Sequence, residues 1–296
     1  MEITNNYKLP EPLVNAVKNQ PYDPGESYIT ATGLISPPLI RKLKALHDHE
    51  ITEDAMDRIW ALMGSIGHRI LEFSTERGLA EERLFADIAG KKVSAQIDNL
   101  SLTVYDDLHD LTDYKFTSAW AVVFGKDEWE QQLNIQDYLL WVNGYDVDRL
   151  FICAILRDWD KNKVKAGYPP AQVHTIQIAK WEREKQEEYI ARRLAMHLAA
   201  EEGIVSVCSD SERWKKEPVF KVMKEGRKTA LRVLPTMGGA IDWMKEKDPK
   251  GKQGLFIKKF DGSYTRCEGY CSVQQFCPEY QNGNYQKKIN KKLLKV

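Results

Sequence analysis

Two aspartates and a lysine stand at the ends of two short apolar runs, in a pattern that could bind a metal ion. Asp98 ends the run VSAQID, whereas Asp113 and Lys115 end the run LHDLTDYK. Side chains at positions i and i+2 of a strand share a face, so Asp113 and Lys115 are predicted to point the same way. If the two strands pair, Asp98 is brought beside Asp113. Two carboxylates on neighbouring strands form the hard-oxygen site that Mg²⁺ or Mn²⁺ requires.

A lysine beside such a site could orient a water molecule and offset the charge that grows on a phosphate. The chemistry that this set would serve is metal-assisted attack of water on a phosphodiester. Taken alone, the D-x-K spacing favours a simpler interpretation, an ion pair between Asp113 and Lys115 on a half-buried sheet. The surrounding elements decide between the two.

The elements that must position these residues indicate a mixed α/β fold. An amphipathic helix is predicted over about residues 53–76, because apolar residues recur there at helical spacing: Met56, Ile59, Trp60, Met63, Ile66, Ile70 and Phe73. The expected strands lie at residues 83–88, 93–104, 108–116, 147–156 and 173–178, and further helices at 127–142 and 182–202. This order predicts a mixed sheet with helices packed on it.

In this order the residues resemble a known family, the PD-(D/E)XK nucleases, and within it the RecB-like exonucleases that phages often encode. The resemblance covers about residues 50–203. It rests on five ordered segments, which are GSIGHRILE with His68, AEERL with Glu81, QID with Asp98, DYK with Asp113 and Lys115, and WEQQLN with Gln132. It implies a restriction-endonuclease-like core, in which helices flank a mixed central sheet.

The resemblance also implies roles for the residues of the two strands. Asp98 and Asp113 would bind Mg²⁺ or Mn²⁺, assisted by the backbone carbonyl of Tyr114. Lys115 would position or activate the attacking water.

Three further roles are implied around this pair of strands. Glu81 would be another acidic ligand, direct or through water, and its neighbour Glu82 is the alternative. His68 would bind the metal or contact a phosphate, and Gln132 would help to hold the site or the DNA. The chain departs from the family at Gln136, where tyrosine is usual.

Four of the five cysteines lie in the C-terminal part of the chain. Cys267, Cys271 and Cys277 form a C-x₃-C-x₅-C array, and Cys208 stands apart from them. Four thiolates suit either tetrahedral zinc or an iron–sulfur cluster. A lone cysteine with a compact trio favours a [4Fe–4S] cluster, with Zn²⁺ and free thiols as the alternatives. The array is similar to the C-terminal motif of iron–sulfur nucleases of the same branch, such as AddB, with one extra residue in the first gap.

The net charge of the chain changes sign at about the same position where the cysteine-rich part begins. Residues 1–203 carry a net charge of −10 and residues 204–296 one of +10, although the chain as a whole is neutral. Three parts are expected, which are an N-terminal segment (1–50), the nuclease core (51–203) and a small, basic α+β region that bears the cysteines (204–296). A solvated tail and a contact with DNA phosphates are the two interpretations of the terminal lysines Lys287, Lys288, Lys291 and Lys292.

Together these patterns predict a Mg²⁺- or Mn²⁺-dependent deoxyribonuclease, an exonuclease on linear DNA that serves phage recombination or DNA processing. The alternatives are an endonuclease, a CRISPR-adaptation-type nuclease, and a non-catalytic DNA-binding or assembly module stapled by zinc. DNA is the expected partner, and a single-strand annealing protein is implied by the resemblance alone. Neither a membrane-spanning run nor a secretory signal is recognisable, so the bacterial or host cytoplasm is expected.

Overall fold

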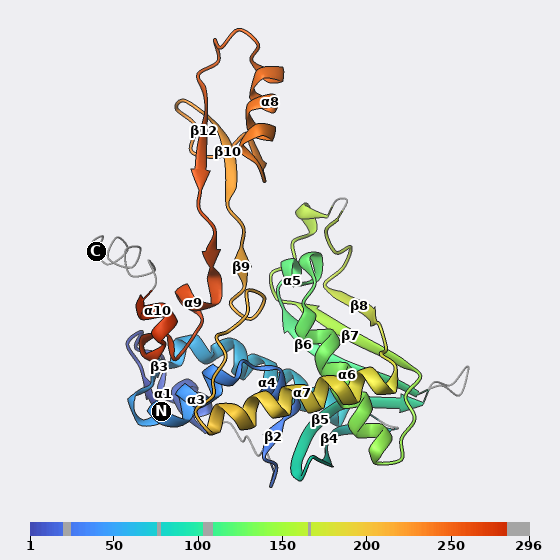
Figure 1. The fold of residues 1–296 in the computed structure, drawn as a ribbon. Helices are drawn as coiled ribbons and strands as arrows, with labels where there is room; N and C mark the ends of the chain where they lie inside the picture. The colour runs from blue at the N-terminus through green and yellow to red at the C-terminus, as the bar shows by residue number, and fades with distance from the viewer. Residues whose placement is uncertain (20–24, 76–77, 103–108, 165–166, 283–296) are drawn as a thin grey trace. The chain divides into compact units, whose positions relative to one another are not determined.

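The chain folds into two compact units, described here from a computed structural model (Figure 1). The structure describes residues 1–19, 25–75, 78–102, 109–164 and 167–282. Unit 1 spans Met1–Ser206 and unit 2 begins at Val207. Residues 1–50 belong to unit 1, and the boundary between the units lies close to the place where charge and cysteine content change. The terminal lysines Lys287, Lys288, Lys291 and Lys292 lie outside the described residues.

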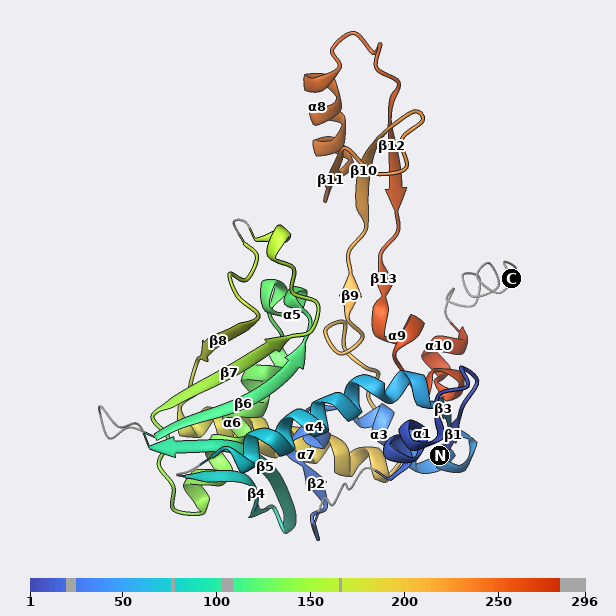
Figure 2. The ribbon, with the colours of Figure 1, turned by 180° about the vertical axis from the view of Figure 1, so that it is seen from behind.

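A six-stranded mixed sheet forms the centre of unit 1 (Figure 2). Its strands are β2 (Ile29–Thr30), β4 (Leu79–Ile88), β5 (Lys91–Leu102), β6 (His109–Thr117), β7 (Arg149–Leu156) and β8 (Val173–Ile178). The order is β2-β5-β6-β7-β8, and β4 pairs with β5. Strand β6 runs parallel to β7 and antiparallel to β5. The predicted mixed sheet flanked by helices is confirmed.

Helices pack on this sheet and close the core. They are α2 (Ala31–Ile35), α3 (Pro38–His47), α4 (Ile59–Phe73), α5 (Ala119–Phe124), α6 (Asp127–Val142) and α7 (Arg183–Glu201). Helix α6 contacts β4 through β8, whereas α4 contacts β4, β5 and β6. The core joins β-branched and leucine side chains of the sheet, such as Ile152, to helix residues such as Leu139 and Leu194. No helix among the described residues is long and apolar enough to span a membrane.

The N-terminal residues add a small layer of their own to unit 1. Strand β1 (Glu2–Thr4) pairs in parallel with β3 (Thr52–Asp54), and α1 (Glu11–Lys18) contacts α4. A second buried cluster joins these elements.

Helix α4 is shorter than the amphipathic helix predicted over residues 53–76, and its apolar stripe is largely exposed. Residues 53–58 form the end of β3 and a 3₁₀ turn instead. Trp60, Ile70 and Phe73 of the stripe are 55%, 61% and 75% exposed, while Leu62 on another side of the helix is buried. The helix is therefore turned so that His68, rather than the stripe, faces the sheet.

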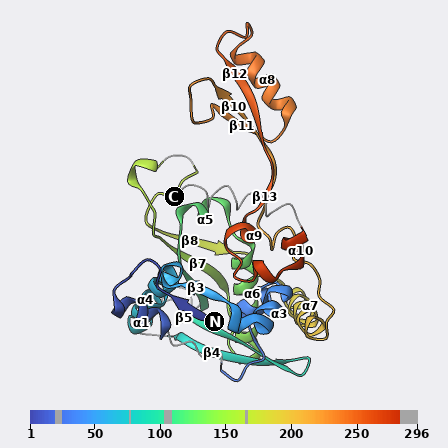
Figure 3. The same ribbon diagram turned by 90° about the vertical axis from the view of Figure 1, so that its left-hand side faces the viewer.

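Unit 2 is a small α+β structure (Figure 3). Its three-stranded sheet has the order β11 (Arg232–Leu234), β10 (Val219–Lys224) and β12 (Leu255–Phe260), and α8 (Met237–Lys247) contacts all three strands. The short strands β9 (Lys215–Lys216) and β13 (Ser263–Tyr264) pair with each other. Helices α9 (Thr265–Gly269) and α10 (Pro278–Asn282) follow and carry the cysteine-bearing segment.

Candidate metal centre

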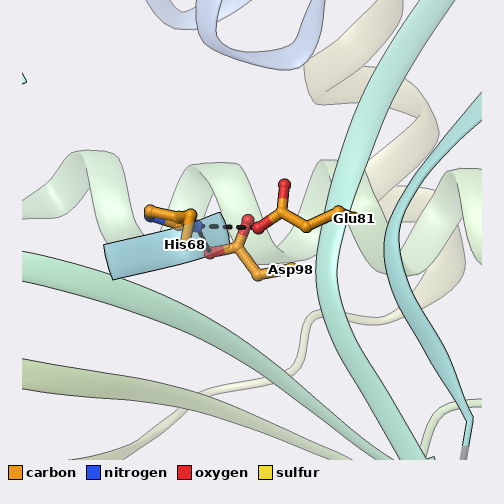
Figure 4. A group of neighbouring side chains, drawn as sticks. All are labelled: His68, Glu81 and Asp98. Carbon is orange, nitrogen blue, oxygen red and sulfur yellow. Dashed lines mark hydrogen bonds and ion pairs between the residues drawn. The ribbon is translucent and has the colours of Figure 1, made fainter. Parts of the chain in front are cut away.

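His68, Glu81 and Asp98 converge on one point from three elements (Figure 4). His68 comes from α4, Glu81 from β4 and Asp98 from β5. His68 Nδ1 lies 2.9 Å from Glu81 Oε1 and 3.5 Å from Asp98 Oδ2. One ligand atom of each residue lies within 4.8 Å of the other two.

The backbone of β4 is distorted where it presents Glu81. Glu81 lies across from Asp98, between the paired positions Ala80–Asn99 and Glu82–Ile97, and its φ is 53°. A non-glycine residue in this left-handed region costs about 1–2 kcal/mol, which surrounding contacts must offset. Glu82 is exposed, so the structure turns Glu81, not its neighbour, toward His68.

Asp98 stands at a fork between two strands. The antiparallel ladder of β5 and β6 ends at the pair Asn99–Thr112, while the other half of β5 pairs with β4 and β2. At the fork the Tyr114 amide donates a hydrogen bond to Asp98 Oδ2 at 2.8 Å. The carboxylate thus takes the place of a strand partner for that amide, which needs one when buried.

A second polar group lies on β6 and α6. Lys115 Nζ is 2.5 Å from Asp113 Oδ2 and donates to Gln132 Oε1 at 3.0 Å. Gln132 Nε2 donates in turn to Asp113 Oδ1 at 2.5 Å. Asp113 is only 1% exposed, and the Lys115 side chain is 25% exposed. Gln132 therefore restricts the orientation of both the Asp113 carboxylate and the Lys115 ammonium.

Both groups line one hollow of about 1110 Å³ in unit 1. His68, Glu81, Asp98, Asp113, Lys115 and Gln132 all contribute to its wall. The structure thus brings together the six side chains that the sequence predicted for this site. It divides them into a histidine–carboxylate trio and a triad around Lys115, and Asp113 belongs to the triad. The amide of Tyr114 holds this residue against Asp98 through its hydrogen bond. The role of the Tyr114 carbonyl as a metal ligand stays a prediction.

Burial and nearby charges shift the pKa values of two members of the trio, Asp98 and His68. Burial, together with the nearby charge of Asp113, raises the pKa of Asp98 to about 7 from 3.8. Burial alone would lower the pKa of His68, but its hydrogen bond with Glu81 and the charges of Asp98, Glu81 and Asp113 outweigh burial and raise that pKa. A site that holds buried carboxylates against such a cost favours a bound cation.

The donor set fits a divalent cation. Octahedral Mg²⁺ with ligands at about 2.1 Å places neighbouring donors about 3 Å apart and opposite donors about 4.2 Å apart. The ligand atoms of His68, Glu81 and Asp98 already lie within 4.8 Å of one another, so small side-chain movements suffice. The two carboxylates suit Mg²⁺ or Mn²⁺.

Two supporting residues escaped the sequence analysis, and a third, Gln136, was noted there only as a departure from the family. Gln96 Nε2 donates to Glu81 Oε2 at 2.6 Å, and Arg83 Nη2 donates to Gln96 Oε1 at 2.9 Å. Gln136, which is 1% exposed, donates from Nε2 to the backbone carbonyl of Gln96 at 2.9 Å. One signal was available, because Gln96 and Arg83 each lie two positions from a predicted acidic ligand and so share its face of the strand.

Gly67 lets α4 approach the sheet closely. A Cβ at this position would lie 2.5 and 2.6 Å from the two Cε atoms of the Phe116 ring, and closer still to Cζ. Real side chains do not tolerate such distances, so only glycine fits while Phe116 keeps its position. The adjacent His68 can therefore reach Glu81 and Asp98.

The four C-terminal cysteines gather in unit 2. Arg266 of α9 donates from its amide to the Arg213 carbonyl at 3.2 Å and from Nη1 to the Glu212 carbonyl at 3.1 Å, which joins the segment after Cys208 to the helix that bears Cys267. Burial, followed by the charges of Glu212 and of other cysteines, Cys277 and Cys267, raises the pKa of Cys208 to about 12.

The remaining cysteines join the same group. Burial raises the pKa of Cys267 too, and the neighbouring Cys271 and Cys277 raise it further. Across the part of the chain that the structure describes, no three cysteine sulfurs come within 4.8 Å of one another. All four cysteines belong to unit 2. A metal group bound by them would therefore cross-link segments within unit 2.

Comparisons with known proteins find distant likenesses in structure. No established family profile and no curated protein matches the sequence. The crystal structure of SSO0001 is similar over 69% of this chain and 89% of that chain, at 15% identity and a TM-score of 0.47. A protein of Eubacterium rectale named as a candidate exonuclease is similar over 49% of this chain and 55% of its own, at 10% identity and a TM-score of 0.31. Both scores lie below 0.5, so the functional argument rests on the site itself.

Proposed function

We propose that the protein is a metal-dependent deoxyribonuclease of the PD-(D/E)XK type that degrades linear DNA from its ends. One observation carries this proposal. A histidine and two acids from three elements converge at a strand fork, and a lysine held by Asp113 and Gln132 lies in the same hollow. Action on ends, rather than within the strand, rests on the resemblance to RecB-like exonucleases.

The residues divide the work of hydrolysis between them. His68, Glu81 and Asp98 would hold the cation, with Asp113 and the Tyr114 carbonyl as the further donors that the family resemblance implies. When bound, the cation would supply Lewis acidity and offset the charge of the phosphate.

Lys115 would hold the attacking water. Its ammonium lies against Asp113 and Gln132, which restrict its orientation, and a quarter of the side chain remains accessible. In the reaction, the water oxygen forms a bond to phosphorus and gives up one proton, while the ester P–O bond breaks and the leaving oxygen takes up one proton. A positioned cationic donor stabilises the charge that develops on the phosphate oxygens.

We further propose that Cys208, Cys267, Cys271 and Cys277 bind a [4Fe–4S] cluster with a structural role. A tetrahedral zinc site with Zn–S bonds of about 2.3 Å requires sulfurs about 3.8 Å apart. A cubane cluster places each thiolate on a different iron, and the lone cysteine with a compact trio in the sequence favours this arrangement. Bound there, the cluster would stabilise the fold of unit 2.

Linear and closed circular DNA, each with Mg²⁺ or with a chelator, test the nuclease proposal. We expect loss of linear DNA with Mg²⁺ only, and none with Lys115→Ala or Asp98→Asn protein. Nicking of the circles would identify an endonuclease instead. Undiminished degradation in chelator, or by the Lys115→Ala protein, would exclude the proposed mechanism.

A further inference from the structure

The sheet of unit 2 has one covered face and one open face (Figure 3). Helix α8 contacts β10, β11 and β12, and Val222 of β10 and Ala240 of α8 are both fully buried. Side chains alternate between the faces of a strand, so the neighbours of Val222 on β10 point away from α8. Phe256 and Val233 are 44% and 50% exposed, as expected for the face without a helix.

The strand register gives the composition of this open face. Lys221 pairs with Lys258 across β10 and β12, and on its other side with Val233 of β11. The pairs Val219–Phe260 and Met223–Phe256 flank the two lysines on the same face. The open face therefore consists of Val219, Lys221, Met223, Val233, Phe256, Lys258 and Phe260, a pair of cations between two aromatic rings.

Lys221 and Lys258 hold two positive charges opposite each other on the open face. Like charges directly opposite each other on a sheet are destabilising. Both ammonium groups lie over the Phe260 ring, at 4.0 Å for Lys221 and 5.3 Å for Lys258 from its centroid. Among the described residues no carboxylate forms an ion pair with either lysine, whereas the adjacent Lys259, on the other face, pairs with Asp261 at 3.0 Å. An anion between Lys221 and Lys258 would relieve the repulsion.

The surroundings of the open face are also cationic. Residues 219–260 contain 11 Lys and Arg but only four Asp and Glu. A partner with closely spaced negative charges is therefore favoured over a neutral or basic one. An exposed aromatic ring beside the cations further favours a partner that offers flat apolar surfaces.

We propose that this open face binds single-stranded DNA, with phosphates at Lys221 and Lys258 and a base stacked on Phe256. A single strand offers both a charged backbone and free base faces, and proteins bind it through cationic grooves with aromatic side chains. A duplex hides its base faces within the stack and matches only the lysines. The inference rests on the proposed nuclease function. It adds that the DNA substrate is single-stranded where unit 2 binds it.

Adjacent lysines on opposite faces supply a matched test. Full-length protein in chelator, so that DNA is not cleaved, is titrated into dye-labelled (dT)₂₀ and followed by fluorescence anisotropy. Lys258→Glu is expected to raise the Kd about tenfold and to lower the slope of log Kd against log salt by about 1. Lys259→Glu carries the same charge change on the covered face and should stay within about twofold of wild type. Equal effects of both substitutions, or no effect of either, would overturn the proposal.

Two substitutions of Phe256 distinguish stacking of a base on the ring from a simple apolar contact. Phe256→Tyr keeps a ring and should bind (dT)₂₀ like wild type, whereas Phe256→Leu keeps apolar area but should raise the Kd about tenfold. Binding of a 20-base-pair duplex should be weaker in wild type and unchanged by Phe256→Leu. A duplex that binds as tightly as (dT)₂₀ and loses as much affinity on Phe256→Leu would contradict a single-strand surface.

Binding in chelator is independent of catalysis, so the two proposals fail separately. If wild type cleaves DNA while Lys258→Glu binds (dT)₂₀ normally, only the open-face inference is wrong. If wild type cleaves no DNA but shows the predicted difference between Lys258→Glu and Lys259→Glu, only the nuclease proposal is wrong. Circular dichroism spectra that match wild type establish that each variant is folded.

Discussion

Gly67 offers a sensitive test of how α4 positions the metal centre. Carbon atoms in contact lie about 3.5–4.0 Å apart. A Cβ at Gly67 would lie 2.5 and 2.6 Å from two carbons of the Phe116 ring, so the helix or the ring must move by about 1 Å or more. Gly64, one turn earlier on the same helix, has open space around its Cβ position. Gly67→Ala and Gly64→Ala therefore form a matched pair.

The magnitude follows from the difference between the two variants. Each gains about 1 kcal/mol of helix propensity, because alanine replaces glycine inside a helix. Gly67→Ala alone pays for overpacking, which costs about 1–3 kcal/mol. In urea unfolding, the Gly67→Ala protein should be about 1–3 kcal/mol less stable than the Gly64→Ala protein at equal m-value.

Activity should follow the same division. His68 follows Gly67 directly and lies 2.9 Å from Glu81, so a shift of about 1 Å disrupts the trio and can cost about 100-fold in rate. Phe116→Ala should restore room for Gly67→Ala, which a double-mutant cycle would register as coupling of about 1–3 kcal/mol. Equal stability and equal activity of the Gly67→Ala and Gly64→Ala proteins would refute the close approach of α4 to the sheet.

Three further predictions concern pH, the cysteines and a buried arginine. Without metal, the pKa of Asp98 is raised to about 7 from 3.8, so the stability that this group contributes is lost as pH rises from about 4 to 7. Metal binding requires the ionised form of Asp98, so Mg²⁺ should raise the thermal unfolding midpoint of the wild type more at pH 8 than at pH 6. A rise that does not depend on pH would contradict Asp98 as a metal ligand. Cys208→Ser should lose iron and brown colour after anaerobic purification, while the same change at Cys153, the fifth cysteine, on β7 of unit 1, keeps both. Zinc in a colourless wild type would exclude the cluster. Arg193 donates to three carbonyls at the end of α2, so Arg193→Ala should cost about 3 kcal/mol in urea unfolding, and a loss below about 1 kcal/mol would show that these bonds contribute little.

Local pattern predicted the sheet well, including the strands that carry the candidate site. The predicted strand over residues 173–178 matches β8, and the helix over 127–142 matches α6. The i, i+2 spacing of Asp113 and Lys115 fixed their shared direction, because strand geometry alone sets it. These features depend on neighbours in the sequence, which is the information that a single chain provides.

Features that depend on distant contacts could not be predicted in this way. The stripe of α4 reads as a buried face, yet Phe73 is 75% exposed, because Gly67 and His68 decide which side meets the sheet. The left-handed backbone at Glu81 and the support from Gln96 arise from pairing between β4 and β5. Likewise, the open face of unit 2 exists only once the register sets Lys221 against Lys258.

Asp113 shows which part of a side chain's environment the sequence can predict. The family resemblance implied a metal ligand, and the residue does line the same hollow as the trio. Its carboxylate, however, contacts Lys115 and Gln132, at 2.5 Å in both cases. Spacing on a strand predicts the direction of a side chain but cannot tell which of several nearby partners it contacts.

The adjacent acids Glu81 and Glu82 allow the most direct measurement of the central claim. Substitution to glutamine removes one negative charge in either case, but only Glu81 contacts His68, and Glu82 is exposed. The initial rate of Mg²⁺-dependent cleavage of linear DNA should fall about 100-fold or more in Glu81→Gln, since even outer residues of a metal site typically contribute 10–100-fold. Glu82→Gln should cleave at the wild-type rate. Equal rates for the two variants, or a larger loss in Glu82→Gln, would contradict a nuclease centre built on His68, Glu81 and Asp98.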